Sequence, residues 1–297
     1  MPQTDVNSIC LACPRRCGAE RDKQPGFCGV GNAYKIARVG LHEWEEPCIS
    51  YGKGSGTVFF SGCNLGCVFC QNSKISHGYS GKYIDDDTLL YEMQRLEQLG
   101  AVNINLVTPS HYAFKLPSVL EKFKEHSDLP VVYNTGAYDS VTVLRNLCGL
   151  VDIYLPDLKY FSSALSAKYS GAADYFEKAF SAIREMHRQT GYAVFDDDGH
   201  MKSGMLVRHM VLPGMYRDSF AVLDALSREF DPQRLPISLM SQYFPTDRAH
   251  DFPEINRKLT TLEYGKVTDY ALKLGFVNGY VQERTSAKEE YVPDFDY

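Results

Sequence analysis

Short apolar runs alternate with longer amphipathic stretches along the chain from Thr57 onward. The apolar runs predict strands at 57–61, 103–108, 130–134, 151–156, 206–211 and 236–240, with a further candidate at 277–281. The amphipathic stretches predict helices at 86–99, 116–126, 139–148, 172–190, 218–229 and 262–274. A repeated strand–helix order indicates parallel strands joined by right-handed crossovers. About six such units are too few for a complete eight-stranded barrel, so we expect an α/β fold with a partial, open parallel β/α barrel.

The first 50 residues differ from the rest in composition, because they are rich in cysteine and glycine and poor in apolar runs before a candidate strand at 34–39. Cys10, Cys13, Cys17 and Cys28 follow the spacing C-x2-C-x3-C-x10-C. Four thiolates so spaced suit a tetrahedral zinc ion, and they suit an iron–sulfur cluster about equally well. The expected organisation is a small Cys-rich metal-binding segment (1–50), a barrel (51–285) and a carboxy-terminal tail (286–297).

A second group of cysteines directly follows the first predicted barrel strand. Cys63, Cys67 and Cys70 lie at C-x3-C-x2-C within the stretch S-G-C-N-L-G-C-V-F-C-Q-N. Three thiolates on one short loop can hold three corners of a 4Fe-4S cluster and leave one iron open for chemistry. A structural zinc loop would need a fourth ligand close by, and Gln71 and Asn72 are poor ones. The spacing therefore favours a reactive iron–sulfur site.

This loop resembles the signature of the radical S-adenosylmethionine (SAM) superfamily. Together with the amino-terminal C-L-A-C-P-R-R-C-G, it resembles an uncharacterised iron–sulfur branch related to pyruvate formate-lyase activating enzymes. The resemblance implies that SAM binds the open iron and is cleaved reductively to abstract hydrogen from a substrate. It also implies an electron donor of the flavodoxin or ferredoxin type, and a protein substrate in which a glycine becomes a glycyl radical. Radical modification of a small molecule or peptide is one alternative, and a non-catalytic electron carrier with two clusters is another.

Polar side chains follow the ends of the predicted strands, where parallel α/β barrels place their functional groups. Asp157 and Lys159 lie two residues apart and therefore face one side, either as SAM ligands or as a simple ion pair. The resemblance implies that Asp157, Lys159 and Arg208 contact the polar groups of SAM, because they match motifs at strand ends. It further implies cofactor-binding positions for Phe69, near the adenine, and for Thr108, Asn134 and Thr135.

Two positions near these strand ends depart from a simple pattern. Thr108 stands where radical SAM enzymes commonly carry a glycine-rich G-G-E that takes the amino group of SAM. Its hydroxyl and nearby backbone carbonyls are candidate substitutes. His111 is a candidate metal ligand or proton carrier, and equally a residue that only caps the following segment.

Composition and charge narrow the function classes. The 297-residue chain has ordinary hydrophobic (44%) and charged (23%) contents, which suit a globular protein. A net charge of −6 argues against broad nucleic-acid binding. Neither a membrane-span-length apolar run nor a signal peptide is apparent, so we expect a cytoplasmic protein with no membrane partner. Its nine cysteines are then more suited to metals than to disulfides.

Four other features have plain structural interpretations. Trp44 is either a substrate platform or, more simply, packed against the core. The acidic residues around it, Glu43, Glu45 and Glu46, are most simply a solvated turn. Cys148 is expected to be a small buried residue. The run at 196–199, D-D-D-G, predicts a surface turn between helix and strand, with an acidic metal-binding loop as the alternative.

Overall fold

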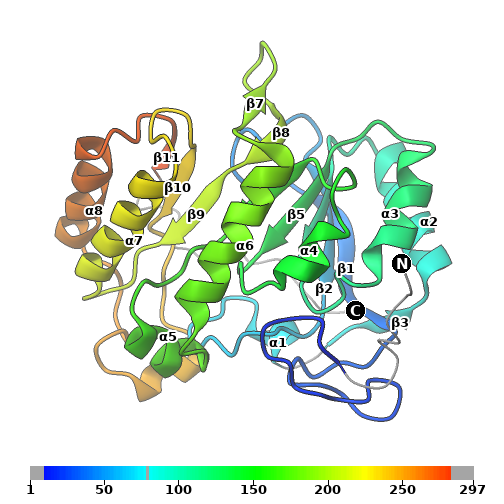
Figure 1. The fold of residues 1–297 in the computed structure, drawn as a ribbon, viewed down its shortest axis with the longest axis horizontal. Coiled ribbons are helices and arrows are strands. Elements are labelled where there is room, and N and C mark those ends of the chain that lie inside the picture. Colours follow the sequence, from blue (N-terminus) through cyan, green and yellow to red (C-terminus); the bar gives the residue numbers. More distant parts are fainter. Residues whose placement is uncertain (1–9, 78–79, 282–297) are drawn as a thin grey trace.

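The computed structural model of the protein describes residues 10–77 and 80–281 and has the expected mixed α/β architecture (Figure 1). Four parallel strands pair in chain order at its centre: β2 (Ser55–Phe60), β4 (Ile104–Val107), β5 (Val131–Thr135) and β6 (Ile153–Pro156). The parallel arrangement continues through β8 (Met201–Met205), β9 (Val207–Met210), β10 (Ile237–Met240) and β11 (Gly279–Val281). Every residue of β2, β4, β5, β6 and β10 is buried, as expected for parallel strands covered on both faces.

The sheet is open, as predicted. At one edge β1 (Tyr34–His42) pairs antiparallel with β2, and β3 (Lys82–Ile84) pairs antiparallel with β1. This eight-stranded sheet ends in β8 and β7 (Val194–Phe195), and β11, β10 and β9 form a separate three-stranded sheet. β8 and β9 are separated only by Leu206, and a parallel bridge between Asp157 and Arg208 links the two sheets. No pairing between described residues connects β11 back to β1 or β3. The result is a partial barrel.

Helices follow the strands and cover the outer face, as Figure 1 shows. They are α2 (Asp86–Gln98), α3 (Leu116–Lys124), α4 (Val141–Arg145), α5 (Ser163–Ser170), α6 (Tyr175–Thr190), α7 (Tyr216–Glu229) and α8 (Thr261–Lys273). A short α1 (Ser73–Ser76) and a 3-10 turn, η1 (Asp247–Asp251), complete the set. Asp85 caps α2 by accepting a hydrogen bond from the Thr88 backbone N–H at 2.9 Å. Among the described helices, none has both the length and the apolar character that crossing a membrane requires.

The sequence pattern missed the elements that lack a clear apolar run. β3, β8 and β7 (Val194–Phe195) are short or carry polar residues, and α5 is made largely of small and polar residues. These elements depend on neighbours for their stability, because β8 pairs with both β6 and β7. Periodicity alone therefore gives a weak signal for them.

The segment after β1 enters the barrel. Cys48 and Ile49 form a buried cluster with residues of the central strands: Val132, Ile153, Leu155, Met201 and Leu206. The expectation of a solvated turn is therefore wrong for Glu45 and Glu46, although Glu43 is exposed. The fold places both carboxyl groups near Arg208 inside the barrel. The domain boundaries remain predictions: β1 joins the barrel sheet, and the tail at 286–297 lies outside the described residues.

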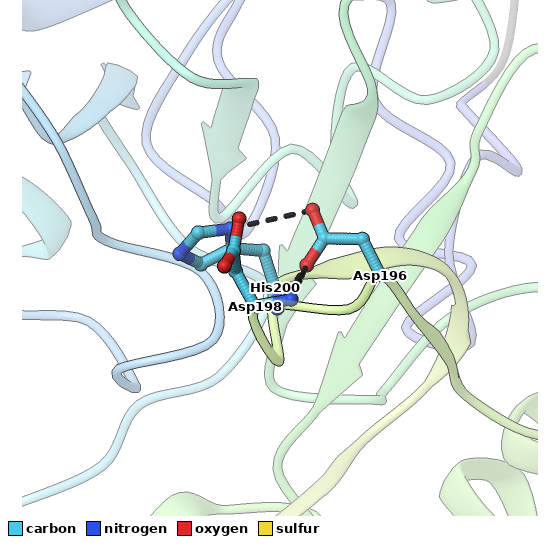
Figure 2. Close-up of side chains that lie close together, drawn as sticks. All are labelled: Asp196, Asp198 and His200. Carbon is cyan, nitrogen blue, oxygen red and sulfur yellow. Dashed lines mark hydrogen bonds and ion pairs between the residues drawn. The ribbon is translucent and has the colours of Figure 1, made fainter.

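Two further expectations concern the surface. The prediction that Cys148 is buried is wrong, because α4 ends at Arg145 and the turns that follow leave the thiol exposed. The acidic run forms an exposed turn, as predicted, but it connects β7 with β8 rather than a helix with a strand. Figure 2 shows Asp196, Asp198 and His200 side by side in this turn. Asp196 accepts from the His200 backbone N–H at 2.8 Å and pairs with Lys202 at 2.9 Å, so it already has a cationic partner.

Candidate active site

The loop that follows β2 carries Cys63, Cys67 and Cys70. The Cys70 N–H donates to the Cys67 carbonyl at 3.2 Å, which closes a turn between the second and third cysteines. Each sulfur also has a polar neighbour. The Leu65 N–H donates to Cys63 Sγ at 3.3 Å, Ser170 Oγ donates to Cys67 Sγ at 2.9 Å, and Ser76 Oγ lies 3.1 Å from Cys70 Sγ. The loop is thus folded with its three thiols held in place.

The electrostatics of this trio fit a metal centre. Burial raises the pKa of the Cys63 and Cys70 thiols, and the nearby Cys67 thiol raises the pKa of both further, because the three groups lie near one another. Three thiolates in such a place need a bound cation. Within the described ranges, only Asp196, Asp198 and His200 bring three ligand atoms within 4.8 Å of one another. The three sulfurs are therefore spread more widely than the ligands of a single ion, which fits a larger iron–sulfur cluster.

A cleft opens beside the cysteine loop at the carboxyl ends of the parallel strands. It is lined by the three cysteines and by every residue that the sequence suggested for cofactor binding, namely Phe69, Thr108, Asn134, Thr135, Asp157, Lys159 and Arg208. The amino-terminal cysteines do not line it. Residues from five strand ends, more than 100 positions apart, thus converge on one place, as the barrel rule predicts.

Charged side chains form a connected network on the floor of the cleft. Asp157 Oδ1 pairs with Arg208 Nε at 2.7 Å, and Asp157 Oδ2 pairs with Lys159 Nζ at 2.7 Å. Burial opposes the charged form of Asp157, but the two cations hold its pKa below the usual value. Burial likewise opposes the charge on Lys159, while the Asp157 carboxylate holds the pKa of Lys159 above its usual value. Asp157 and Lys159 thus form the expected ion pair and also line the cleft, and their role as SAM ligands stays a prediction.

Glu45 is the cleft residue that sequence reasoning missed. Its Oε2 pairs with Arg208 Nη1 at 3.1 Å, and its Oε1 accepts from the side-chain amides of Asn105 and Asn134, each at 3.1 Å. Beside it, Glu46 is buried with Oε2 3.9 Å from Arg208 Nη1, and burial raises its pKa. No local pattern marks Glu45, because an acidic residue in a short polar segment close to a proline usually belongs to an exposed turn.

The cleft residues Thr108, Thr135 and Phe69 differ in backbone conformation and in the contacts that their side chains make. Thr108 has a backbone φ of +59°, which is strained for a β-branched residue and is the kind of conformation that concentrates at functional sites. Thr135 donates its hydroxyl to the buried Asp139 at 2.6 Å, so that hydroxyl is already engaged. Phe69 is buried and meets Tyr160 and Tyr243 edge to face. Its ring is therefore held rigidly in the cleft wall.

His111 has a structural position. It is buried, it does not line the cleft, and its Nε2 lies 2.9 Å from the Ser61 carbonyl at the start of the cysteine loop. Burial and the nearby Arg21 lower its pKa to about 3, so the ring is neutral at pH 7 and Nε2–H donates. The geometry favours a structural role other than the three candidates, because the ring anchors the backbone of the cysteine loop at Ser61.

A partial parallel barrel with a three-cysteine loop at its carboxyl-terminal rim defines a class of iron–sulfur proteins that act at an incompletely ligated cluster. Comparison of the sequence identifies the family: residues 57–222, more than half of the chain, match the radical SAM superfamily. The chain therefore belongs to the radical SAM superfamily, whose members use a 4Fe-4S cluster and SAM.

The chain is also similar to individual proteins. The chain is 29% identical over 274 residues to the uncharacterized protein MJ0674 of Methanocaldococcus jannaschii, an alignment that covers 89% of this chain and 74% of that protein. A mutant of spore photoproduct lyase has a similar fold, with a TM-score of 0.52, 13% identity, and coverage of 82% of this chain and 79% of that one.

A second structure is similar over a smaller share of its length. SuiB of Streptococcus suis bound to S-adenosylmethionine has a TM-score of 0.50 and 13% identity, and the match covers 74% of this chain. The chain spans about half of SuiB, 48% of its length. At these identities both structures bear on the fold alone.

Proposed function

We propose that this radical SAM enzyme binds its cluster through Cys63, Cys67 and Cys70 and abstracts a hydrogen atom from a glycine of a partner protein. When bound, the cluster and SAM together supply one-electron reductive cleavage and hydrogen abstraction. The observation that carries the proposal is the shared cleft, which brings the three cysteines together with all seven residues suggested for cofactor binding.

The charges of the cleft complement the groups of SAM. The molecule has a carboxylate, an ammonium, a sulfonium and two ribose hydroxyls. Lys159 and Arg208 offer cations for the carboxylate, while Asp157, Glu45 and Asn134 offer acceptors for the ammonium and the hydroxyls. Their ion pairs with one another hold these side chains in position before the cofactor binds, which reduces the ordering cost of binding. Glu45 thus takes the place of the acidic residue that the Thr108 segment lacks.

The size of the cleft favours a substrate that reaches in from outside. Its volume is about 240 Å³, which is below the range of ~300–1,000 Å³ that encloses one drug-sized ligand. A molecule the size of SAM would therefore fill it. Trp44 lines the cleft and is 61% exposed, so it offers an aromatic surface for an incoming peptide segment. A glycine on an extended loop of a partner is narrow enough to enter beside it.

The decisive experiment uses anaerobically purified and reconstituted protein in a reducing assay. We expect 5′-deoxyadenosine to form with wild-type protein and to fall to background in Cys67→Ala. Cys148→Ala, which changes an exposed thiol away from the cleft, is the matched control. Full SAM cleavage by Cys67→Ala would refute the proposed cluster site, and equal losses in both variants would point to non-specific damage.

A second measurement tests the substrate. A glycyl-radical-type partner should yield a doublet signal in electron paramagnetic resonance (EPR) and stoichiometric 5′-deoxyadenosine. Turnover with a small molecule or free peptide, and none with such a partner, would favour the alternative radical target. An electron carrier without catalysis would release no 5′-deoxyadenosine with any substrate. The natural donor is expected to be a flavodoxin or ferredoxin of the cytoplasm, since the exposed and buried thiols alike need reducing conditions.

A further inference from the structure

The four amino-terminal cysteines form a second group of sulfurs outside the cleft. Two backbone hydrogen bonds pair the strand-like ends of this loop, Cys10 N–H to the Ala19 carbonyl at 2.9 Å and Gly18 N–H to the Cys10 carbonyl at 3.2 Å. Cys13 and Cys28 are buried, whereas Cys10 is partly exposed and Cys17 is exposed.

The Cys17 and Cys28 sulfurs lie on either side of Gly26. A methyl group on Gly26 would lie 3.1 Å from Cys17 Sγ and 3.7 Å from Cys28 Sγ. The glycine thus keeps space open between two of the sulfurs.

The spacing of the sulfurs separates a cluster from a zinc ion. Zinc–sulfur bonds of about 2.3 Å in a tetrahedron place the four sulfurs roughly 3.8 Å apart. No three of these cysteines bring their sulfurs within 4.8 Å of one another, since the three-ligand group at Asp196 is the one found in the described parts of the chain. The sulfurs of the Cys63 loop likewise lie outside that limit, and the radical SAM superfamily uses a 4Fe-4S cluster. In this respect the amino-terminal group is like the Cys63 loop, with a fourth cysteine added.

The two cysteine groups are in direct contact. The Cys63 N–H donates to the Cys28 carbonyl at 3.3 Å, and the Cβ of any larger residue at Gly62 would lie 2.4 Å from that carbonyl oxygen. Arg15 fastens the two loops together by donating from Nε to the Asn64 carbonyl at 2.8 Å and from Nη2 to the Ser170 carbonyl at 3.0 Å. Figure 1 shows this amino-terminal loop, in dark blue, beside α1 at the rim of the sheet.

We propose that Cys10, Cys13, Cys17 and Cys28 bind a second 4Fe-4S cluster, which relays electrons to the cluster at Cys63, Cys67 and Cys70. A one-electron protein donor of the flavodoxin or ferredoxin class reduces the second cluster. That cluster returns to its oxidised form as the same electron passes to the first one, so no other redox partner is needed. The partly exposed Cys10 and the exposed Cys17 give the donor access, and the Cys28–Cys63 contact provides a short path inward. The binding of the second cluster stands on its own, whereas the relay rests on the proposed function.

The test of binding leaves the amino-terminal loop unchanged. In the triple variant Cys63→Ala/Cys67→Ala/Cys70→Ala, we expect about four iron atoms per chain, little zinc, and a reduced-cluster EPR signal that SAM does not alter. The converse variant, Cys10→Ala/Cys13→Ala, should keep about four irons with a SAM-sensitive signal, against about eight in the wild type. Zinc, or no metal, in the triple variant would overturn the proposal. If wild-type protein with about four irons still cleaved SAM, the second cluster would be refuted while the proposed function stood.

The test of the relay compares two reductants on Cys10→Ala/Cys13→Ala. With a reduced flavodoxin as donor, we expect SAM cleavage to fall at least tenfold, while cleavage driven by dithionite stays within about twofold of the wild type. Cys148→Ala should change neither rate. Equal losses with both reductants would show that the loop only supports the fold around Cys63, and unchanged rates with both would show that electrons enter elsewhere.

Discussion

Replacing Asp157 by Asn removes the one carboxylate that pairs with both cations of the cleft. Arg208 Nε and Lys159 Nζ each lie 2.7 Å from it, and the side chains of Asp157, Lys159 and Arg208 are 16%, 18% and 13% exposed. Breaking a buried ion pair by removing one partner costs about 3–5 kcal/mol. Arg208 keeps Glu45 at 3.1 Å, so the lower end, ~3 kcal/mol, is expected. Lys159 would be left as a buried cation with no carboxylate of its own.

This loss converts into a measurable melting temperature. An unfolding entropy of about 2.1 cal/mol/K per residue gives roughly 0.6 kcal/mol/K for a chain of 297 residues, so ~3 kcal/mol corresponds to a decrease of about 5 °C. The assay is circular dichroism of the anaerobically reconstituted protein during heating. Asp87→Asn is the matched control, because its pair with Lys122 is 88% and 54% exposed and should contribute less than about 1 kcal/mol. If Asp157→Asn melted within 1 °C of that control, the network would not stabilise the site as argued.

Three further predictions concern single residues. Glu45→Gln should weaken SAM binding at least tenfold in anaerobic calorimetry, because a hydrogen bond to a charged group contributes about 1.5–3 kcal/mol. The control is Glu43→Gln, which changes an exposed residue and should bind SAM as the wild type does. If the two variants bound SAM with equal affinity, Glu45 would be excluded from the SAM site. His111→Gln keeps a donor toward Ser61 without a titrating ring. The folded-state pKa of His111 is about 3, below the ordinary ~6.5, so its contribution is present above pH 6.5 and lost as the pH falls. Between pH 6.5 and 5.5 the variant should therefore lose about 1 kcal/mol less stability in urea unfolding than the wild type, and parallel pH profiles would contradict this. Thr108→Gly removes the strain of a positive φ. The variant should melt within about 2 °C of the wild type, because the relief of strain in the folded state offsets the added chain entropy of the unfolded state. A large decrease in melting temperature would show that the Thr108 side chain holds the loop.

Most of the candidate site could be predicted from local sequence. Asp157 and Thr108, for example, lie at strand ends that follow buried apolar runs. Parallel strands bring their carboxyl ends to the same rim of the barrel, so the residues at those ends could be expected to line one cleft. Thr135 shows the limit of this rule. It occupies the expected strand end, but its hydroxyl is bonded to Asp139, and no pattern in the sequence specifies that rotamer.

The sequence alone determined the parallel strands, which follow from alternating apolar and amphipathic runs, and it placed the cysteines of the two predicted metal sites a few residues apart. Tertiary structure decided the things that depend on approach between distant segments. Glu45 became a partner of Arg208, 163 positions away, because residues 45–49 turn into the barrel and bury Cys48 and Ile49. The amino-terminal cysteines came to lie against Cys63 for the same kind of reason, since burial and hydrogen bonding between remote backbones leave no periodic trace in the sequence.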